Sequence, residues 1–177
     1  MAFDIKKAII DRLRATNREN IETVIEYMEK HHFFTYHCHH HHHYDGGLAE
    51  HAWQTYQIAQ RLDEERCANN PNAKKLDDDS LAICSLLHDF CNCSGMRNVG
   101  EHQHGKRSSD MLEALGLKLN QQELLAVRFH MSLEGKEKYP LYGDALKSQL
   151  RYIVHKADGK SAKLKKGYED SYTKKAQ

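Results

Sequence analysis

Six side chains that can bind a divalent cation recur along the sequence at positions that face, or nearly face, the interior of predicted helices. They are His51, His88, Asp89, His104, His130 and Asp158. Neutral imidazole and carboxylate are both good ligands for divalent cations. Burying this many of them without a partner would be costly, and a cation offsets the cost. A single core-facing histidine is more often just hydrogen-bonded, so the prediction of a metal site rests on the whole set.

The most conspicuous histidines lie elsewhere, in the stretch YHCHHHHHYDGGLAEH with its run His39–His43. The run is internal and continues into a motif, so it is not a purification tag. Consecutive histidines project in different directions and make a poor preformed site, although they can scavenge Ni²⁺ or Zn²⁺. We expect Gly46-Gly47 to form a turn that precedes the helix of His51, and His42 or His43 to line the mouth of a pocket.

The elements that position these residues are predicted to be helices. At 100° per residue, Leu48, His51, Ala52 and Thr55 share one face of a helix over 48–62, so His51 points toward the core. Further helices are predicted over 1–15, 20–31, about 81–90, 106–115, 121–131 and 144–160, the last with Leu146 on its apolar stripe and Asp158 at the edge of that stripe. His88-Asp89 falls near a helix end, where both side chains can turn toward one ion. We find no strand pair, repeat or domain boundary, and the predicted fold is an all-α compact bundle of roughly six to eight helices.

Composition narrows the class of protein. The chain has 177 residues and a net charge of +1 with histidine neutral. It also has no basic stripe with interleaved aromatic residues. Both features disfavour nucleic acid as a partner. The sequence contains no apolar run of about 18 residues, so it predicts no membrane span. Five cysteines, an odd number, favour reduced thiols and a cytoplasmic setting.

Five blocks of this sequence resemble those of the HD superfamily of metal-dependent phosphohydrolases. The blocks are GGLAEH (46–51), SLLHDFCN (85–92), HGKRS (104–108), AVRFHMS (126–132) and VHKAD (154–158). A His-Asp dipeptide alone carries no information, whereas five blocks in the right order are specific. The resemblance implies a single HD domain over 1–177 with its core at 42–162. The N-terminal helices within 3–31 are expected to pack on that core, and the lysine-rich tail 163–177 is expected to be exposed.

Carried over residue by residue, the resemblance implies that His51, His88, Asp89 and Asp158 hold one metal ion. With a second ion, Asp89 bridges the two and His104 and His130 bind the second. With one ion, these two histidines face the substrate phosphate. The sequence does not choose between the two arrangements, nor among Mn, Fe, Ni, Zn and Mg.

One position departs from the family pattern. Many relatives have a lysine three residues after the aspartate of the doublet, and here that residue is Asn92. A neutral amide supplies no charge to a phosphate, so Lys106 or Arg107 is the candidate for that role, against the alternative that both are simply solvated at a helix start. Asn92, Lys106 and Arg107 are therefore the predicted substrate-binding residues.

The function implied is hydrolysis of a phosphoester of a nucleotide or small phosphorylated metabolite by metal-activated water. Asp89 would orient the water, and His104 or His130 would stabilise phosphate or protonate the leaving group. Assembly stays open, with a homodimer as one option because Trp53 lies off the core face of its helix and needs a partner or a packed neighbour.

Three alternatives compete with this interpretation. Cys91, Cys93, His102 and His104 could form a zinc module, although structural zinc sites space their cysteines by two to four residues. Cys84 or Cys91 could be a nucleophile, although Cys84 lies on an apolar stripe. A non-catalytic module that binds a nucleotide or metal for regulation is the third, and Asn92 gives it some support.

Overall fold

The structure, a computed structural model, describes residues 3–38, 41–94, 103–131, 133 and 136–167. Within these ranges the chain is helical and has no strand, which confirms the predicted all-α bundle. The helices are α1 (Ile5–Ala15), α2 (Ile21–Lys30), α3 (Gly47–Asn69), α4 (Asp78–Leu87), α5 (His104–Ala114), α6 (Gln121–Arg128), α7 (Tyr142–Lys147) and α8 (Gln149–Ser161), with a short 3-10 helix η1 (Phe90–Ser94) after α4.

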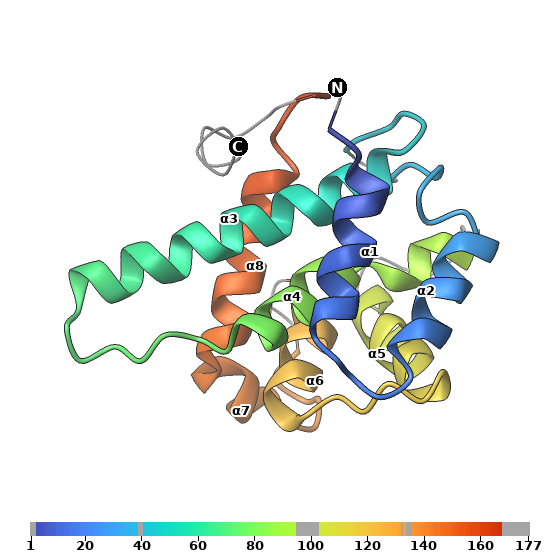
Figure 1. Ribbon diagram of the computed structural model, residues 1–177. Coiled ribbons are helices and arrows are strands. Elements are labelled where there is room, and N and C mark those ends of the chain that lie inside the picture. The colour runs from blue at the N-terminus through green and yellow to red at the C-terminus, as the bar shows by residue number, and fades with distance from the viewer. Residues whose placement is uncertain (1–2, 39–40, 95–102, 132, 134–135, 168–177) are drawn as a thin grey trace.

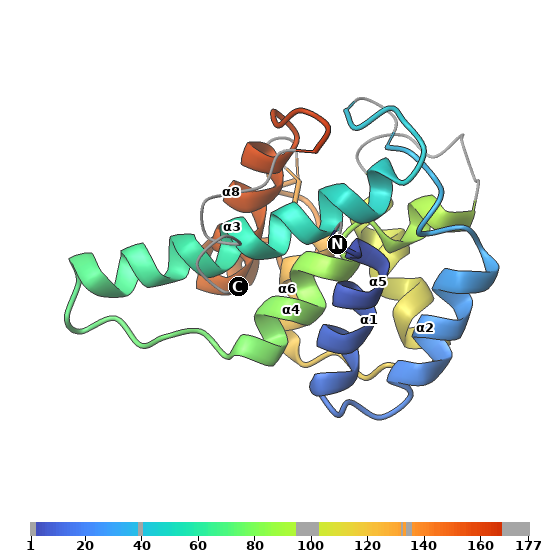
Figure 2. The same ribbon diagram turned by 45° about the horizontal axis from the view of Figure 1, so that its top comes forward.

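The longest helix, α3, organises the molecule. It packs most extensively against α8 and α4, while α5 and α6 pack against each other and α6 also contacts α8. Figures 1 and 2 show α8 crossing α3, and the C-terminal end of α3 projecting beyond the other helices before the chain returns to α4. The N-terminal half of α3 therefore lies inside the bundle, which is where His51 is found.

Helix α4 passes through the centre of the core. Every residue from Ser80 to Leu87 is buried, as expected of a helix that is apolar around its whole circumference. Its start is fixed by Asp77, whose carboxylate accepts a hydrogen bond from the backbone N–H of Ser80 at 2.8 Å. Because α4 is covered on all sides, the doublet His88-Asp89 at its C-terminal end lies in the interior of the bundle.

A buried carboxylate connects the N-terminal helices to the rest of the bundle. Glu123 in α6 is completely buried, accepts a hydrogen bond from the Ser80 hydroxyl at 2.7 Å, and forms an ion pair with Arg18, which lies between α1 and α2. The same side chain closes a capping box with Asn120 at the start of α6. Trp53 packs against the rings of Phe3 and Tyr56, so it has neighbours within the chain.

Several helix boundaries differ from those predicted from the sequence: α3, for example, continues to Asn69 rather than ending at 62. Two of the differences change where singled-out residues lie. The predicted helix 144–160 is interrupted at Ser148, which takes an extended backbone conformation and caps α8 by accepting a hydrogen bond from the N–H of Arg151. The interruption changes the register, so Leu146 is 57% exposed rather than part of an apolar stripe. Helix α6 ends at Arg128, earlier than predicted, and His130 lies in the turn that follows.

None of the helices in the described part of the chain combines the length and the apolar character needed to cross a lipid bilayer.

Candidate metal centre

Four side chains from α3, the end of α4 and α8 meet around one point. His51 Nε2 lies 3.1 Å from His88 Nε2, 3.2 Å from Asp158 Oδ1 and 4.0 Å from Asp89 Oδ2. His88 Nε2 lies 3.7 Å from each of the same two carboxylate oxygens. Ligand atoms about 2.1 Å from a common ion are separated by roughly 3 to 3.5 Å. These four residues, hereafter the first ligand set, could hold a metal ion after small adjustments.

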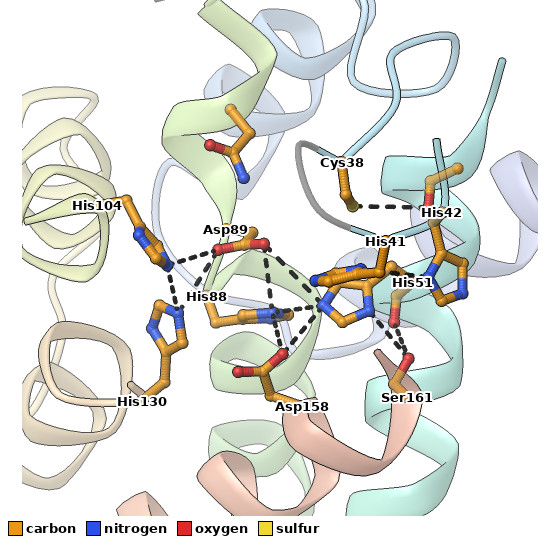
Figure 3. A network of polar contacts seen from close by, with 12 residues as sticks. Cys38, His41, His42, His51, His88, Asp89, His104, His130, Asp158 and Ser161 are labelled. Atoms are coloured by element: carbon orange, nitrogen blue, oxygen red, sulfur yellow. Dashed lines mark hydrogen bonds and ion pairs between the residues drawn. The ribbon is translucent and has the colours of Figure 1, made fainter. Parts of the chain in front are cut away.

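A second group lies on the other side of Asp89. His104 Nε2 and His130 Nε2 are 3.0 Å apart, and they lie 3.4 Å and 3.5 Å from Asp89 Oδ1. Asp89 thus turns Oδ2 toward the first ligand set and Oδ1 toward the second set, formed by Asp89, His104 and His130 (Figure 3). Oδ1 is buried and accepts no hydrogen bond of normal geometry. A carboxylate with this environment on both oxygens is suited to bridging two cations.

Hydrogen bonds on the far side of the rings fix which nitrogen carries the proton. The Nδ1 atoms of His88 and His130 each lie 2.8 Å from a backbone carbonyl, of Ser85 and Val127 respectively. A carbonyl can only accept, so each Nδ1 donates and each Nε2 carries the lone pair when the ring is neutral.

His51 is oriented in the same way by a hydroxyl. Its Nδ1 lies 3.0 Å from Ser161 Oγ, and that hydroxyl can donate its own proton to the carbonyl of His51, at 3.2 Å, or to Gln54 Oε1, at 3.4 Å. When that proton goes to either oxygen, Ser161 Oγ accepts from Nδ1 and the lone pair of His51 is on Nε2, the tautomer of a metal ligand bound through Nε2. In this tautomer two lone pairs, on His51 and His88, face each other at 3.1 Å. Either a proton on His51 Nε2 or a cation beside both nitrogens removes the repulsion between them.

The electrostatics of the site follow from burial and from close neighbours. Burial lowers the pKa of His88 to about 4, so its Nε2 is unprotonated at neutral pH. Burial alone would raise the pKa of Asp89 and of Asp158, but the surrounding histidines reverse this and lower both pKa values below the usual range of a carboxyl. Two carboxylates and the unprotonated imidazole of His88 belong to the N/O donor set that Zn²⁺, Mn²⁺, Fe²⁺ and Ni²⁺ accept.

The segment that carries His130 is held by α8. Arg151 donates from Nε to the carbonyl of Phe129 at 2.8 Å and from Nη2 to the carbonyl of Met131 at 3.0 Å. His155 Nδ1 lies 2.6 Å from the carbonyl of His130 itself. Three consecutive carbonyls outside a helix are thus bound by the helix that also supplies Asp158, so the turn after α6 is fixed relative to the first ligand set.

Two glycines allow the close approaches that the site needs. A Cβ atom at Gly105 would lie 2.6 Å from the carbonyl oxygen of Arg128 and 2.7 Å from that of Val127, so only glycine lets the start of α5 touch the end of α6. Gly46 has a φ of +81°, consistent with the predicted turn, and a Cβ at Gly47 would lie 1.9 Å from the carbonyl oxygen of His42. The first contact places His104 beside His130, and the second presses the histidine run onto α3.

The described members of the histidine run are close to the site but differ in their contacts. His41 packs against the His51 ring with 4.3 Å between centroids, and His42 is buried with Nε2 2.8 Å from Gln54 Oε1. His43 instead packs on His37 and contacts the carbonyl of Cys38. His39 and His40 lie outside the described residues. The expectation that His42 or His43 lines the pocket mouth missed His41, which packs against a residue of the first ligand set.

The three residues predicted to bind substrate are less tightly connected to the site. Asn92 is half-buried in η1, and its N–H donates to the carbonyl of Asp89 at 2.9 Å. The ammonium of Lys106 pairs with Asp110 at 2.5 Å, and its side chain is 57% exposed. Arg107 is half-buried, near enough to Cys91 to influence the pKa of its thiol. Their role toward a substrate stays a prediction.

The cysteines do not compete for the site among the described residues. The groups there that could hold a metal ion contain only histidine and aspartate. Burial raises the pKa of the Cys91 thiol to about 11 and that of Cys93 to about 12, and burial raises that of Cys84 well above its usual value, so none is an activated nucleophile. His102, a member of the alternative zinc module, lies outside the described residues.

Sequence reasoning missed the residues that orient the ligands. Ser161, Gln54, Arg151 and His155 act through hydrogen bonds to ring nitrogens and backbone carbonyls, for which no spacing pattern exists. A signal was available for Ser161 alone, because it lies three residues after Asp158, close to one turn further along the same helix.

Comparison of the chain with protein-family models, with curated proteins and with solved structures finds no match.

Proposed function

We propose that this chain is an HD-type metal-dependent phosphohydrolase that cleaves a phosphoester of a nucleotide or a small phosphorylated metabolite. The order of its five motif blocks supports the family, and the meeting of their six candidate ligands in two adjoining sets supports the metal centre. A cytoplasmic setting and a small-molecule substrate rather than nucleic acid belong to the same proposal.

A single observation carries the proposal. Nε2 of His51 and Nε2 of His88 lie 3.1 Å apart, and carboxylate oxygens of Asp89 and Asp158 lie around them. A purely structural cluster of buried polar groups pairs donors with acceptors. Here neutral His88 Nε2 and both carboxylates can only accept, so His51 Nε2 is the one possible donor among the four atoms. A divalent cation satisfies all four atoms together.

The chemistry assigned to the site needs little covalent participation by the protein. When bound, a divalent cation lowers the pKa of water toward neutrality and polarises a phosphoryl oxygen. The first ligand set holds the cation, and Asp89 orients the attacking water through the oxygen that faces the second set. His104 and His130 bind a second cation or, with one cation, contact the phosphate and donate a proton to the leaving group. Asn92, Lys106 and Arg107 are assigned to substrate binding.

The test combines metal analysis with hydrolysis. Protein purified without added metal is analysed for Mn, Fe, Ni, Zn and Mg, and then assayed with Mn²⁺ on a panel of nucleotides and generic phosphoesters. We expect one or two ions per chain and turnover of at least one substrate. Asp89→Asn keeps the shape of the side chain but removes its charge, so it should bind less metal and lose turnover. Asp11→Asn, at an exposed ion pair on α1, is the matched control. Full activity of Asp89→Asn would rule out the proposed site.

A non-catalytic HD-type module that binds a nucleotide or metal for regulation is the second candidate. It is favoured by Asn92, which stands where many relatives have a lysine. Metal binding with saturable nucleotide binding but no turnover across the panel would support it in place of the hydrolase.

A further inference from the structure

His41 is the described histidine of the run whose ring packs most closely against a metal-ligand candidate. Its ring centroid lies 4.3 Å from that of His51, whereas that of His42 lies 5.2 Å away. Asp89 and Asp158 both lie near enough to influence its pKa, which burial, the first cause, lowers to about 4. Figure 3 shows His41 next to the His51 ring, with His42 further to the right in the view. His41 is thus next to the centre without being part of either set.

A chain of hydrogen bonds determines where its lone pair lies. Gln54 donates from Nε2 to Glu50 Oε1 at 3.1 Å, so its Oε1 is the atom that faces His42. His42 must donate from Nε2 to this oxygen, at 2.8 Å, which leaves the His42 lone pair on Nδ1. His41 Nδ1 lies 3.2 Å from that atom. His41 therefore donates from Nδ1, and its own lone pair lies on Nε2.

A third cation on His41, His42 and His51 is the competing interpretation, because the three rings lie close enough to share an ion. The hydrogen bonds argue against it. His51 Nε2 already faces His88 and Asp158, and its Nδ1 contacts Ser161 Oγ, so neither ring nitrogen is left for a third ion. Without a carboxylate in the group, two imidazoles are left, which is too few for a stable divalent site.

We propose that His41 Nε2 accepts a hydrogen bond from the water molecule that completes the shell of the cation in the first ligand set. A ring next to a ligand but outside both sets is placed for contact through one water. The contact rests on the proposed metal centre and assigns to the histidine run a part in the site: His41 makes the contact, and the chain His42, Gln54 and Glu50 holds its tautomer.

The first test reads the tautomer and the contact without any assay of activity. In zinc-loaded protein with ¹⁵N-labelled histidine, NMR should show His41 protonated at Nδ1 and unprotonated at Nε2. Adding zinc to the metal-free protein should move the Nε2 resonance by the small amount typical of an accepted hydrogen bond. A resonance typical of direct zinc coordination, a proton on Nε2, or no response to zinc would each overturn the proposal. His43 should not respond.

The second test compares His41→Phe with His43→Phe, two identical substitutions within one run. Phenylalanine keeps a ring against His51 but has no lone pair. His41→Phe should retain the metal content of the native chain and lose at least about tenfold in kcat, with KM changed by less than about threefold. His43→Phe should match the native chain. Loss of an ion, or an unchanged kcat, in His41→Phe contradicts the proposal. If His41→Phe does not fold, His41→Gln is measured in its place. Glutamine retains an acceptor oxygen, so its loss of kcat should be smaller than the roughly tenfold loss expected of phenylalanine.

The two proposals fail in different ways. If the native chain binds metal and shows the predicted NMR response but hydrolyses no phosphoester, the proposed function is wrong and the contact stands. If it hydrolyses phosphoesters but His41→Phe behaves like the native chain, the contact is wrong and the function stands.

Discussion

At the scale of single residues, each ligand is defined by what its second polar atom contacts. His88 and His130 use a carbonyl three residues earlier in the chain, and His51 uses the hydroxyl of Ser161 from another helix. The two carbonyl contacts set the tautomers of His88 and His130 before any cation binds, so their lone pairs are preorganised. Asp89 lacks such a contact on Oδ1, and its carboxylate connects the two sets, with Oδ2 toward the first and Oδ1 toward the second.

Arg151 offers a residue-scale prediction, because it holds the carbonyls on both sides of His130. Arg151→Met keeps much of the buried stem but removes both donors. We expect the affinity of the second ligand set for Mn²⁺ to fall about 10- to 100-fold, as for other outer-shell partners of metal ligands, while the first set is little changed. Titration calorimetry on the metal-free protein measures both. Lys156→Met, exposed on the same helix, is the control, and equal affinities in the two variants would contradict the role of Arg151.

At the scale of elements, the site is produced by helix ends. His88 terminates α4, His104 begins α5 and His130 follows α6. Of the six candidate ligands, only His51 and Asp158 lie in the interior of a helix. They belong to α3 and α8, which pack against each other where they cross. Helix ends let neighbouring residues leave the helical direction, which explains how His88 and Asp89 reach one point together.

Gly105 supports an element-scale prediction. Alanine there would place a Cβ 2.6 Å and 2.7 Å from two carbonyl oxygens at the end of α6, so α5 must move away from α6. Because the Val127 carbonyl also binds His130 Nδ1, the shift should weaken the second ligand set first. We expect Gly105→Ala to lose about 1 to 3 kcal/mol of stability and to bind fewer ions by metal analysis. Gly143→Ala, where a Cβ meets nothing within 4 Å, should do neither.

The elements also show how far the sequence could predict the structure. The helical period placed His51 on the inner face of its helix, and a helix end was expected at His88-Asp89; both are confirmed. The break at Ser148 was missed because the apolar spacing from Leu146 to Leu150 fits an uninterrupted helix. The break is decided locally, because the Ser148 hydroxyl accepts a hydrogen bond from the N–H of Arg151 and so starts a new helix. Tautomers and carbonyl contacts could not be predicted, since every residue has a carbonyl and only the fold selects which is used.

At the scale of the whole molecule, the two ligand sets draw on α3, the end of α4, α5, α8 and the turn after α6, so binding of a cation there would be linked to folding. A cation at 100 times its dissociation constant stabilises a folded chain that alone binds it by about 2.7 kcal/mol. For a chain of this length that corresponds to a rise in Tm of roughly 5 to 10 °C.

Thermal unfolding with Mn²⁺ and with chelator should therefore differ by about that amount. Mn²⁺ is preferable to Ni²⁺ because the histidine run can bind nickel in any conformation. Asp158→Asn removes a charge from the first ligand set and should show a clearly smaller difference. An equal rise in this variant would place the stabilising cation elsewhere in the molecule.

The residues of the first ligand set are far apart in the sequence, from His51 to Asp158, although they meet in the fold. This separation matters while the ribosome synthesises the chain. As the chain leaves the ribosome, His51 emerges long before α8, and Ser161, which orients His51, emerges later still. Until α8 emerges, the nascent chain lacks Asp158 and can offer at most three of the four ligands of this set. The four-ligand form requires that α8 pack across α3, so this set could hold a cation with all four ligands only after α8 has been synthesised.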